Sequence, residues 1–365
     1  MARHKPTEFS EPAVMPRMSR LNDSGLGARR TICVVMLASV LLGCEEKSRS
    51  AGAGTVIQLA PELTTIVPAD AKLEKVHGDF QFLEGPVWSS SGYLLFSDMT
   101  RHLIYQWTPP GQLSIFRDDA DFSRGEPSMR SASGPNGLAF DREGRLTICE
   151  HGNRRVTRLE KDGRLNVLAE RYHGRRLNSP NDLVYRSDGA LFFTDPPFGL
   201  PREDLDPQRE LSFSGIYLLF KNDLILLNDE IKHPNGLALS PDETHLYIDD
   251  GDPERPSIMR YRVHADGSLS EGTVFFEARP PIVPRSLDGI KVDTLGHVYV
   301  STSAGVLVLS PDGRHLGTIR VPEQPTNMAW GDGDGKTLYV TAIPALYRIR
   351  LGIPGSGLPW LGRSL

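Results

Sequence analysis

The stretch Pro234-Asn235-Gly236-Leu237-Ala238-Leu239 decides the fold, because it opens a pattern that the chain repeats. The polar Asn235 begins an apolar strand, Pro241-Asp242 makes a turn, and a second apolar run follows at 245–248. Two apolar runs joined by a short turn of this composition are typical of a β-hairpin. The stretch therefore predicts a polar residue at the start of a strand, followed by a hairpin.

The same pattern occurs six times, at intervals of roughly 40 to 55 residues, which is the length of a four-stranded propeller blade. Each copy has a carboxylate or Asn, then a small residue or its stand-in, and then an apolar strand. The six leading residues are Glu84, Asn136, Asn181, Asn235, Asp288 and Asn327. A turn and a second β-rich run follow each of them, and further Asp-Gly turns fall where a third strand would turn into a fourth.

Six such repeats predict an all-β fold, a six-bladed β-propeller with four-stranded blades. A four-stranded sheet cannot bury both faces alone, so the blades are expected to pack face to face around an axis. Helical periodicity is absent, which counts against an α/β fold. Only two strands clearly follow Asn327, so residues 73–82 are expected to complete the last blade and close the ring. The propeller is expected over residues 73–352, with a C-terminal tail at 353–365.

The amino-terminal segment predicts export of the chain. Arg29-Arg30 precedes an apolar run at 31–42, which is too short to span a bilayer comfortably, and a polar stretch follows. Residues 1–43 are therefore expected to be a signal peptide. The residues before Arg29 are rich in Pro, Ser and charge, and Met18 is an alternative start that would place them outside the translated chain.

The end of the apolar run, Leu41-Leu42-Gly43-Cys44, resembles the lipobox of bacterial lipoproteins. This resemblance implies cleavage before Cys44, lipidation of its sulfur and a periplasmic protein held by a lipid anchor; an ordinary cleaved signal peptide is the alternative. Residues 44–72 are expected to be a linker. Of the three Cys only Cys149 then remains for the mature domain, so no disulfide is expected within the chain, and Cys149 is expected to be a packed thiol.

The charge pattern argues against a nucleic-acid partner. The formal net charge of −5 is small for 365 residues, and no Lys/Arg run interleaves with aromatic residues. A small polar substrate is a better expectation. The sequence predicts no protein partner, and it predicts membrane contact only through the lipid anchor.

The six leading residues are expected to converge, because the first strand of each blade lines the channel of a propeller. Carboxylates and Asn carbonyls without Cys or His make a hard-oxygen site for one divalent cation, with Ca²⁺ preferred over Mg²⁺, Mn²⁺ or Zn²⁺. Asn-Gly as a plain turn signal is the alternative. The second strands return to the same face, so their ends are expected to form a second polar ring: Asp98, Glu150-His151, Asp195, Asp249-Asp250, Thr302 and Thr341.

Several motifs taken together resemble one known family over residues 80–351. The motifs are Glu84-Gly85-Pro86-Val87-Trp88, Cys149-Glu150-His151-Gly152-Asn153-Arg154-Arg155, Leu177-Asn178-Ser179-Pro180-Asn181-Asp182, Pro234-Asn235-Gly236-Leu237-Ala238 and Leu287-Asp288-Gly289. Each motif alone is weak, but the joint set resembles the gluconolactonase and senescence-marker-protein-30 family of lactonases.

This resemblance implies a six-bladed propeller with a cation held by Glu84, Asn235 and Asp288. Asn181 would be a further metal ligand or a substrate contact. The cation can polarise the carbonyl of a sugar lactone, and Asp288 is placed to take the proton from the attacking water. A role of Asp288 as a metal ligand alone is the alternative.

The remaining site predictions concern the surroundings of the ring. Asn136, Asn181, Glu150 and His151 are expected to contact the sugar, although pairing of Glu150 or His151 with a nearby Arg is an alternative. Arg176, next to Arg175, is a candidate for steering the substrate, against the alternative of solvated loop charges. The polar connectors at 119–133 and 196–213 are expected to cap the channel and set specificity.

The sequence therefore predicts a metal-dependent sugar lactone hydrolase. Two other readings stay open: a sugar-binding or sensing propeller with a structural cation, and an aryl-esterase or strictosidine-synthase-like propeller. Gly-x-Ser-x-Gly and His-Glu-x-x-His motifs are absent, which leaves serine-hydrolase and zinc-protease chemistry without support.

Overall fold

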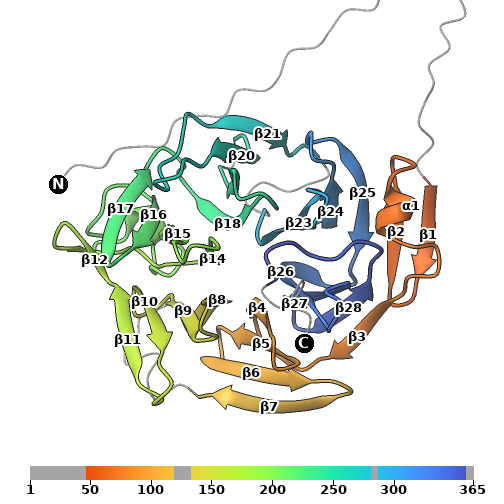
Figure 1. The fold of residues 1–365 in the computed structure, drawn as a ribbon, viewed down its shortest axis with the longest axis horizontal. Coiled ribbons are helices and arrows are strands. Elements are labelled where there is room, and N and C mark those ends of the chain that lie inside the picture. Colours follow the sequence, from red (N-terminus) through yellow and green to blue (C-terminus); the bar gives the residue numbers. More distant parts are fainter. Residues whose placement is uncertain (1–46, 119–132, 253, 281–286, 359–365) are drawn as a thin grey trace, which may run out of the picture. The chain divides into compact units, whose positions relative to one another are not determined.

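The computed structural model describes residues 47–118, 133–252, 254–280 and 287–358. Within these residues the main strands form six sheets, which stand around a common axis as the blades of a β-propeller (Figure 1). The predicted all-β, six-bladed fold is confirmed. The chain divides into two units, Met1–Gly43 and Cys44–Leu365, and the second unit contains the propeller. The predicted signal peptide at 1–43, Cys44 and residues 119–132 lie outside the described residues.

The first three blades follow the order of the chain from the axis outward. The first comprises β4 (Leu83–Ser89), β5 (Tyr93–Asp98), β6 (Leu103–Thr108) and β7 (Gln112–Arg117). The second comprises β8 (Pro135–Phe140), β9 (Leu146–Glu150), β10 (Arg155–Leu159) and β11 (Leu165–Ala169), and the third β14 (Leu183–Tyr185), β15 (Leu191–Asp195), β16 (Gly215–Phe220) and β17 (Asp223–Asn228). A small ladder of β12 (Arg171–Tyr172) and β13 (Arg175–Arg176) lies between them in the chain.

The last three blades complete the ring. The fourth comprises β18 (Pro234–Leu239), β19 (His245–Asp250), β20 (Ser257–Arg262) and β21 (Thr273–Glu277), and the fifth contains β22 (Ile290–Val292), β23 (Val298–Thr302), β24 (Gly305–Leu309) and β25 (His315–Arg320). The sixth comprises β26 (Gln324–Gly331), β27 (Thr337–Ile343), β28 (Leu346–Arg350) and β3 (Leu73–His77). Each inner strand contacts the next around the axis, and β26 contacts β4.

The ring is closed by strands from both ends of the domain. β3 pairs antiparallel with β28, and Leu73 lies opposite Ile349. β3, which precedes the first blade in the chain, therefore supplies the outermost strand of the blade that the carboxyl-terminal strands begin, as the sequence predicts. This closure ties the two ends of the propeller together and leaves no open edge between the first and last blades.

The predicted linker at 44–72 is wrong for most of its described part. β1 (Lys47–Ala51) and β2 (Gly54–Gln58) form a hairpin that pairs with β25, so the fifth sheet has six strands instead of the predicted four. The short helix α1 (Leu63–Ile66) follows and buries both of its end residues in the core. Apolar side chains such as Val56 make this possible, because they cover the edge and face of the blade.

The predicted tail also packs against the propeller over its described part. Ile353 is buried in the core, and Gly355 forms a β-bridge with Asp293.

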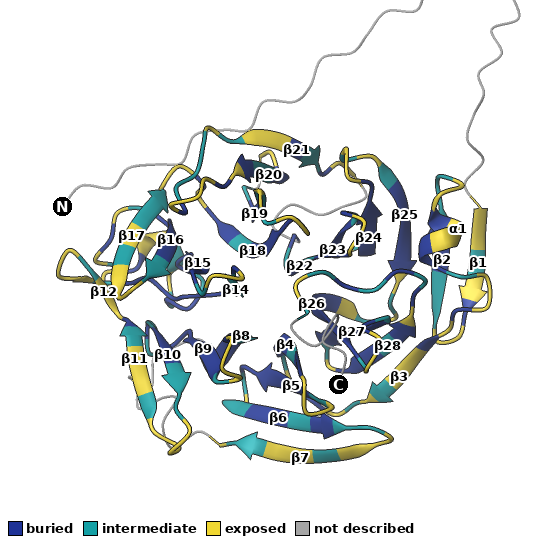
Figure 2. Cartoon of the chain, viewed as in Figure 1, coloured by how far each residue is buried: buried dark blue, intermediate teal, exposed yellow. Residues whose placement is uncertain are grey.

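Burial follows the layers of the blades. Figure 2 shows mostly buried inner and middle strands, while outer strands such as β7 and β11 carry exposed residues. The apolar side chains between neighbouring blades form the core clusters, in which β-branched and aromatic residues predominate. Cys149 is fully buried in β9, and burial raises the pKa of its thiol well above the ordinary value, which agrees with a packed, unreactive thiol.

The glycine after a leading residue allows the blades to approach each other closely. A Cβ on Gly236 would lie 2.2 Å from the carbonyl oxygen of Asp288, and a Cβ on Gly85 would lie 2.0 Å from that of Asn136. Both distances are too short for a side chain, so only Gly fits at these positions. The small residue of the repeat therefore brings the leading residues of adjacent blades together at the axis.

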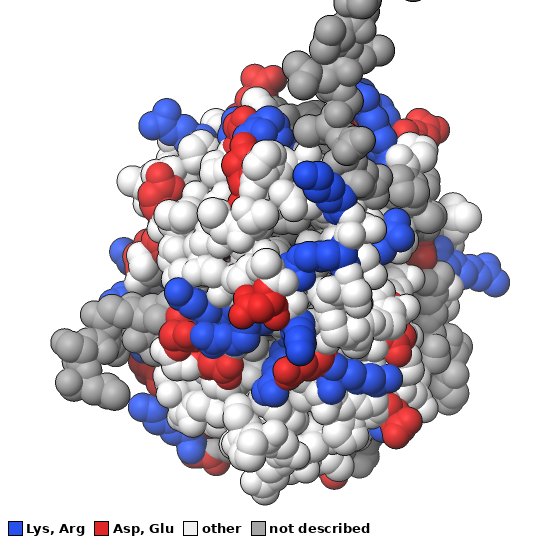
Figure 3. Space-filling model, turned by 90° about the vertical axis from the view of Figure 1, so that its right-hand side faces the viewer, with Lys and Arg blue, Asp and Glu red and all other residues white. Residues whose placement is uncertain are grey.

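Charges of both signs are interspersed on the side of the molecule drawn in Figure 3. That face therefore carries no extended basic surface of the kind that nucleic acids bind. Among the described residues no helix is long and apolar enough to cross a membrane.

Candidate active site

A one-residue bulge disturbs the start of several inner strands at their leading residues. The ladder between β18 and β19 shifts register between Pro234 and Leu237, next to Asn235. Equivalent shifts follow Glu84 in β4 and Pro135 in β8. A bulge bends its strand and re-aims a side chain, and such bulges are common beside active sites. The bulges therefore explain why these polar residues face the channel mouth at the start of otherwise apolar strands.

Side chains at the ends of the second strands hold the bulged backbone. Asp249, which is fully buried in β19, accepts hydrogen bonds from the backbone N–H groups of Asn235 (3.0 Å) and Gly236 (3.1 Å). Thr341 Oγ1 accepts one from the Asn327 N–H at 3.1 Å. These bonds satisfy N–H groups that the bulge removes from the ladder.

Most residues of the predicted second ring therefore bond to the backbone, instead of facing the channel mouth as expected. Asp195 accepts hydrogen bonds from the N–H groups of Asn178 and Ser179, both at 2.8 Å, and Asp98 accepts one from the Phe82 N–H at 3.2 Å. These carboxylates position the backbone of the first ring instead of facing the mouth. Of the residues predicted for the second ring, His151 is the one that lines the cavity described next.

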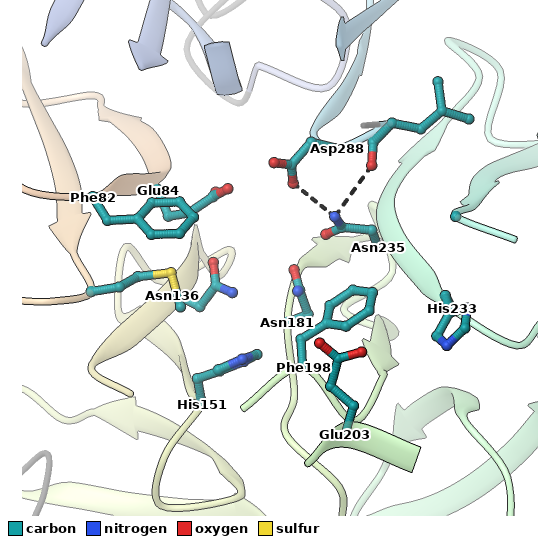
Figure 4. A pocket seen from close by; sticks show the side chains of 13 residues that line it. Phe82, Glu84, Asn136, His151, Asn181, Phe198, Glu203, His233, Asn235 and Asp288 are labelled. Carbon is teal, nitrogen blue, oxygen red and sulfur yellow. Dashed lines mark hydrogen bonds between the residues drawn. The ribbon is translucent and has the colours of Figure 1, made fainter. Parts of the chain in front are cut away.

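A cavity of about 270 Å³ lies at the end of the channel where the inner strands begin. Its lining comes from the first five blades and their connections (Figure 4). The predicted site residues in its lining are Glu84, Asn136, His151, Asn181, Asn235 and Asp288. The structure thus gathers residues from distant parts of the chain, while their predicted roles stay predictions.

The Asn235 amide links two blades across the cavity edge. Its Nδ2 donates to Asp288 Oδ1 at 2.9 Å and to the carbonyl oxygen of Leu287 at 3.4 Å. Because the donor end is used in this way, Asn235 Oδ1 faces the cavity, as do the Glu84 carboxylate and the second oxygen of Asp288 (Figure 4). Oxygen atoms from three blades therefore face one cavity.

Two of the carboxyl groups that line the cavity, those of Glu84 and Asp288, have raised pKa values that a bound cation would lower. Burial, followed by the charge of Asp182, raises the pKa of Glu84 to about 7, although the Gly85 N–H donates to Glu84 Oε2 at 2.9 Å. Burial and the Glu84 carboxylate raise the pKa of Asp288 well above its ordinary value. Both shifts express the cost of ionising two neighbouring carboxyl groups in a poorly hydrated place, and a bound cation would remove that cost.

The donor set fits a hard divalent cation. Asn136 Oδ1 is buried and has no hydrogen-bond partner within the described part of the chain, so the cavity wall contains an acceptor without a protein donor. Carboxylate and amide oxygens are the ligands that Ca²⁺ takes. No group of three or more His, Cys, Asp or Glu among the described residues could hold a metal ion, so Asn oxygens have to complete the set around Glu84 and Asp288.

The sixth leading residue, Asn327, does not line the cavity. It is buried behind Glu84, and its Nδ2 lies 3.2 Å from Glu84 Oε2. Five of the six leading residues therefore face the cavity, and Asn327 supports one of them, Glu84, from behind.

Glu150, which the sequence predicts to contact the sugar, lies outside the cavity lining and is paired with protein groups. Its Oε2 accepts hydrogen bonds from Arg155 Nε and Asn153 Nδ2, both at 2.7 Å, and its Oε1 accepts one from Thr157 Oγ1 at 2.5 Å. Arg155 lies directly opposite Glu150 in the β9–β10 ladder. The alternative of pairing with a nearby Arg is therefore correct, because a buried carboxylate requires such partners.

Arg176 also lies outside the cavity lining, and its predicted contact with substrate stays a prediction. Its guanidinium donates through Nη2 to the carbonyl oxygen of Asn153 at 3.0 Å, and its backbone N–H donates to Glu210 Oε2 at 2.8 Å. Arg175 is exposed and donates to the Glu210 carbonyl oxygen at 3.4 Å. Both are held by the β12–β13 ladder and the connector behind it.

The connector at 196–213 reaches the cavity, whereas that at 119–132 lies outside the described residues. Phe198 and Glu203 of this connector line the cavity, and Glu203 begins a 3-10 turn at Glu203–Leu205 with a φ of 48°. Left-handed backbone is strained for such a residue. The sequence predicts a cap by this connector, but it does not identify these two side chains.

No sequence motif marks the other residues of the cavity lining as part of the site. His233 stacks against Phe198 and lies 2.8 Å from Asp204 through its Nε2. Phe82, Met99 and Leu287 add apolar surface. Sequence reasoning could have identified these residues only from their position beside a leading residue or a strand end.

Comparison with known proteins agrees with this arrangement. The family described as "SMP-30/Gluconolactonase/LRE-like region" matches residues 82–344. A gluconolactonase of Zymomonas mobilis is 31% identical over 348 residues, which are 92% of this chain and 98% of that protein. The solved structure of a gluconolactonase from Xanthomonas campestris has a TM-score of 0.71 at 32% identity, over 84% of this chain and 97% of that chain.

A more distant structure shows the same fold. Regucalcin from Agrobacterium tumefaciens has a TM-score of 0.61 at 20% identity, over 78% of this chain and 94% of that chain. With most of the propeller matched and a relative above 30% identity aligned over nearly its full length, this chain belongs to the SMP-30/gluconolactonase/LRE-like family.

Proposed function

We propose that the chain hydrolyses a sugar lactone in this cavity with the help of one bound divalent cation. The observation that carries the proposal is that Glu84, Asn235 and Asp288, from three different blades, face one cavity (Figure 4). The gluconolactonases of Z. mobilis and X. campestris support the substrate class. The volume of about 270 Å³ lies just below the usual range for small-molecule pockets and suits a small ring compound.

The cation would be held by Glu84, Asn235 and Asp288, with Asn181 as a further ligand or a contact to substrate. Ca²⁺ is the first choice for an all-oxygen set, and Mg²⁺ or Mn²⁺ would retain more water, while Zn²⁺ suits these ligands less well. When bound, such a cation supplies polarisation of the lactone carbonyl and stabilisation of the developing oxyanion.

Asp288 accepts the proton of the attacking water in this proposal. Asn235 holds Asp288 Oδ1 at 2.9 Å, which leaves the second carboxylate oxygen directed into the cavity. The water oxygen bonds to the carbonyl carbon while its proton passes to Asp288. The proton then moves to the ring oxygen as the bond between that oxygen and the carbonyl carbon breaks, so the product is the open hydroxy acid and Asp288 is an anion again.

Polar groups around these residues orient the sugar. Asn136, Asn181 and His151 line the cavity and can bond to hydroxyl groups. His151 Nδ1 lies 3.2 Å from the Pro180 carbonyl oxygen, which fixes the ring of this buried histidine. Phe82 and Phe198 offer apolar faces to the carbon atoms of the ring compound.

The proposal is tested by following acid release from a panel of aldonolactones and an aryl ester. The protein is first treated with a chelator and then supplied with Ca²⁺, Mg²⁺, Mn²⁺ or Zn²⁺ separately. We expect hydrolysis of at least one aldonolactone, its loss on chelation and its return with one of the ions. Cation binding without hydrolysis of any lactone would contradict the enzymatic proposal, and cleavage of the aryl ester alone would contradict the substrate class.

We also propose that the chain is exported and lipidated at Cys44, with the sequence of residues 29–44 as the support. Expression of the full chain and of Cys44→Ser in a bacterium that processes lipoproteins tests this. The full chain should be found with the membrane fraction, and Cys44→Ser should be released from it. Equal fractionation of the two proteins would contradict lipidation.

A further inference from the structure

A chain of hydrogen bonds runs from the cavity into the channel beneath Glu84. Asn327 Nδ2 lies 3.2 Å from Glu84 Oε2 and 3.2 Å from Asp182 Oδ2. Asn327 Oδ1 accepts hydrogen bonds from Lys291 Nζ at 3.1 Å and from the Met328 backbone N–H at 2.8 Å. The three side chains in the middle are buried, with exposed fractions of 2% for Asn327, 3% for Asp182 and 4% for Glu84.

The orientation of the Asn327 amide is determined by these partners. Its oxygen receives an ammonium and a backbone N–H, and its nitrogen faces two carboxylate oxygens. An amide turned over by 180° would place its NH₂ group against the Lys291 ammonium and its oxygen against two carboxylates, which would be unfavourable at both ends. The donor that Lys291 places on Asn327 Oδ1, together with the Met328 N–H, therefore sets the direction in which Asn327 presents its own donor.

Lys291 reaches this network from the other side of the channel. Its side chain lines a second cavity of about 130 Å³, together with Tyr185 and Trp330, and it does not line the cavity of the candidate active site. Its ammonium also donates to the Ile290 carbonyl oxygen at 2.9 Å and lies 3.7 Å from Asp182 Oδ2. A partly buried ammonium with a carboxylate, an amide oxygen and a carbonyl around it is well paired.

We propose that Lys291 is a positioning residue for the cation site, which acts on Glu84 through Asn327. The inference rests on the proposed function, because it assigns Glu84 to the cation. Groups that orient a metal ligand typically change metal affinity by about 10- to 100-fold when they are removed. Without the ammonium, Asn327 Oδ1 keeps only the Met328 N–H of its two donors, so the amide is held less firmly and Glu84 loses a fixed donor on Oε2.

The alternative, in which Lys291 acts only through its charge, predicts an opposite result. An ammonium near the cavity repels a divalent cation, so its removal alone would strengthen cation binding. A positioning role predicts weaker binding after the same substitution. The sign of the change therefore distinguishes the two roles.

The test is calorimetric titration of Ca²⁺ and Mn²⁺ into the chelator-treated full-length chain and its variants. Lys291→Met and Asn327→Leu should each weaken cation binding by about tenfold or more. Both substitutions interrupt one chain of contacts, so their effects should not add. The cation affinity of the double variant should lie within about threefold of that of the single variant that binds the cation less tightly. Lys75→Met is the matched control, because Lys75 pairs with Glu323 at 3.3 Å on the surface. The cation affinity of this variant should stay within about twofold of that of the unchanged chain.

Lys291→Gln supplies a second, milder variant in case Lys291→Met does not fold. Its amide keeps a donor for Asn327 Oδ1 without the charge, so cation affinity should remain within about threefold of the unchanged chain. Thermal unfolding in chelator shows whether each variant is folded. Unchanged or tighter binding by folded Lys291→Met or Asn327→Leu would overturn the inference, as would a tenfold loss in Lys291→Gln. Failure of the unchanged chain to bind any cation would instead contradict the proposed function.

Discussion

Asn235 Nδ2 lies 2.9 Å from Asp288 Oδ1, although the two residues are 53 positions apart in the chain and lead neighbouring blades. This contact joins the two carriers of the proposed chemistry. It orients the Asn235 oxygen toward the cavity and leaves one carboxylate oxygen of Asp288 directed into it. The catalytic proposal depends on this geometry more than on any single side chain.

Asp288→Asn should nearly abolish lactone hydrolysis. The amide cannot take the proton from water, and general base catalysis is typically worth about 10²- to 10⁴-fold in rate. The variant should fold, because the new Oδ1 can still accept the hydrogen bond from Asn235. Initial rates of acid release measure the effect, and Asp266→Asn, a change at an exposed turn, is the control. Activity within about threefold of the unchanged chain would remove Asp288 from the role of base.

Gly236→Ala should destabilise the ring of blades. The added Cβ would meet the Asp288 carbonyl oxygen at 2.2 Å, so the fourth and fifth blades would have to move apart. We expect a loss of about 1–3 kcal/mol in the free energy of unfolding, measured by urea titration, with weakened cation binding. Gly333→Ala is the matched control, since a Cβ there meets nothing within 4 Å. Equal stability of the two variants would contradict the close approach.

Asp249→Asn should destabilise the protein although it leaves the cavity lining untouched. Asp249 accepts two backbone N–H groups from the bulge at Asn235, one on each oxygen. An amide offers one acceptor in their place and turns a donor toward the other N–H, which costs about 1–3 kcal/mol. Urea unfolding of this variant and of Asp266→Asn, at an exposed position, gives the comparison. A change below about 0.5 kcal/mol would show that the bulge does not depend on this carboxylate.

Cation affinity should fall as the pH falls below about 7. Without a cation the pKa of Glu84 is raised to about 7, above its ordinary value of 4.5, chiefly by burial, so the protonated form is favoured below that pH. A cation must then displace this proton, and affinity should decrease by up to about tenfold for each pH unit between 7 and 5. Titrations at several pH values measure the slope. A constant affinity over this range would show that Glu84 does not bind the cation.

The same shift makes the stability of the cation-free protein depend on pH. Because the folded state holds the Glu84 proton more tightly than the unfolded chain, stability from this group is present at low pH and is lost as the pH rises from about 4.5 through about 7. Added cation should restore stability above pH 7. Thermal unfolding in chelator and in excess cation would reveal the difference.

The blade architecture and the gathering of the leading residues could be predicted from the sequence for a simple reason. A repeat that begins each apolar strand with a polar residue places that residue at the same height in every blade, so Glu84, Asn235 and Asp288 line one cavity although they belong to three different blades. Closure by β3 followed in the same way, because the last repeat lacked strands that residues 73–82 could supply.

The site contacts that the sequence does not reveal depend on the neighbour across a strand or a loop. Glu150 and His151 are adjacent in sequence, yet His151 lines the cavity while Glu150 pairs with Arg155. The register of the β9–β10 hairpin places Arg155 opposite Glu150, and a prediction of that register would have indicated this pairing. For Arg176 no local pattern indicates that Glu210 and Asn153 would hold it.

The amino-terminal hairpin shows another limit. β1 and β2 gain their stability by pairing with β25, which lies more than 250 residues further along the chain. A short segment with a few apolar residues cannot reveal from its own pattern that a distant edge strand is free to receive it. The prediction of a linker failed for this reason.

Anomalous diffraction from crystals of the protein soaked with Mn²⁺ tests the central claim most directly. We expect one strong anomalous peak in the cavity, at about 2.0–2.6 Å from carboxylate oxygens of Glu84 and Asp288 and from Asn235 Oδ1. Absence of a peak at that place, or a peak held by other residues, would contradict the account.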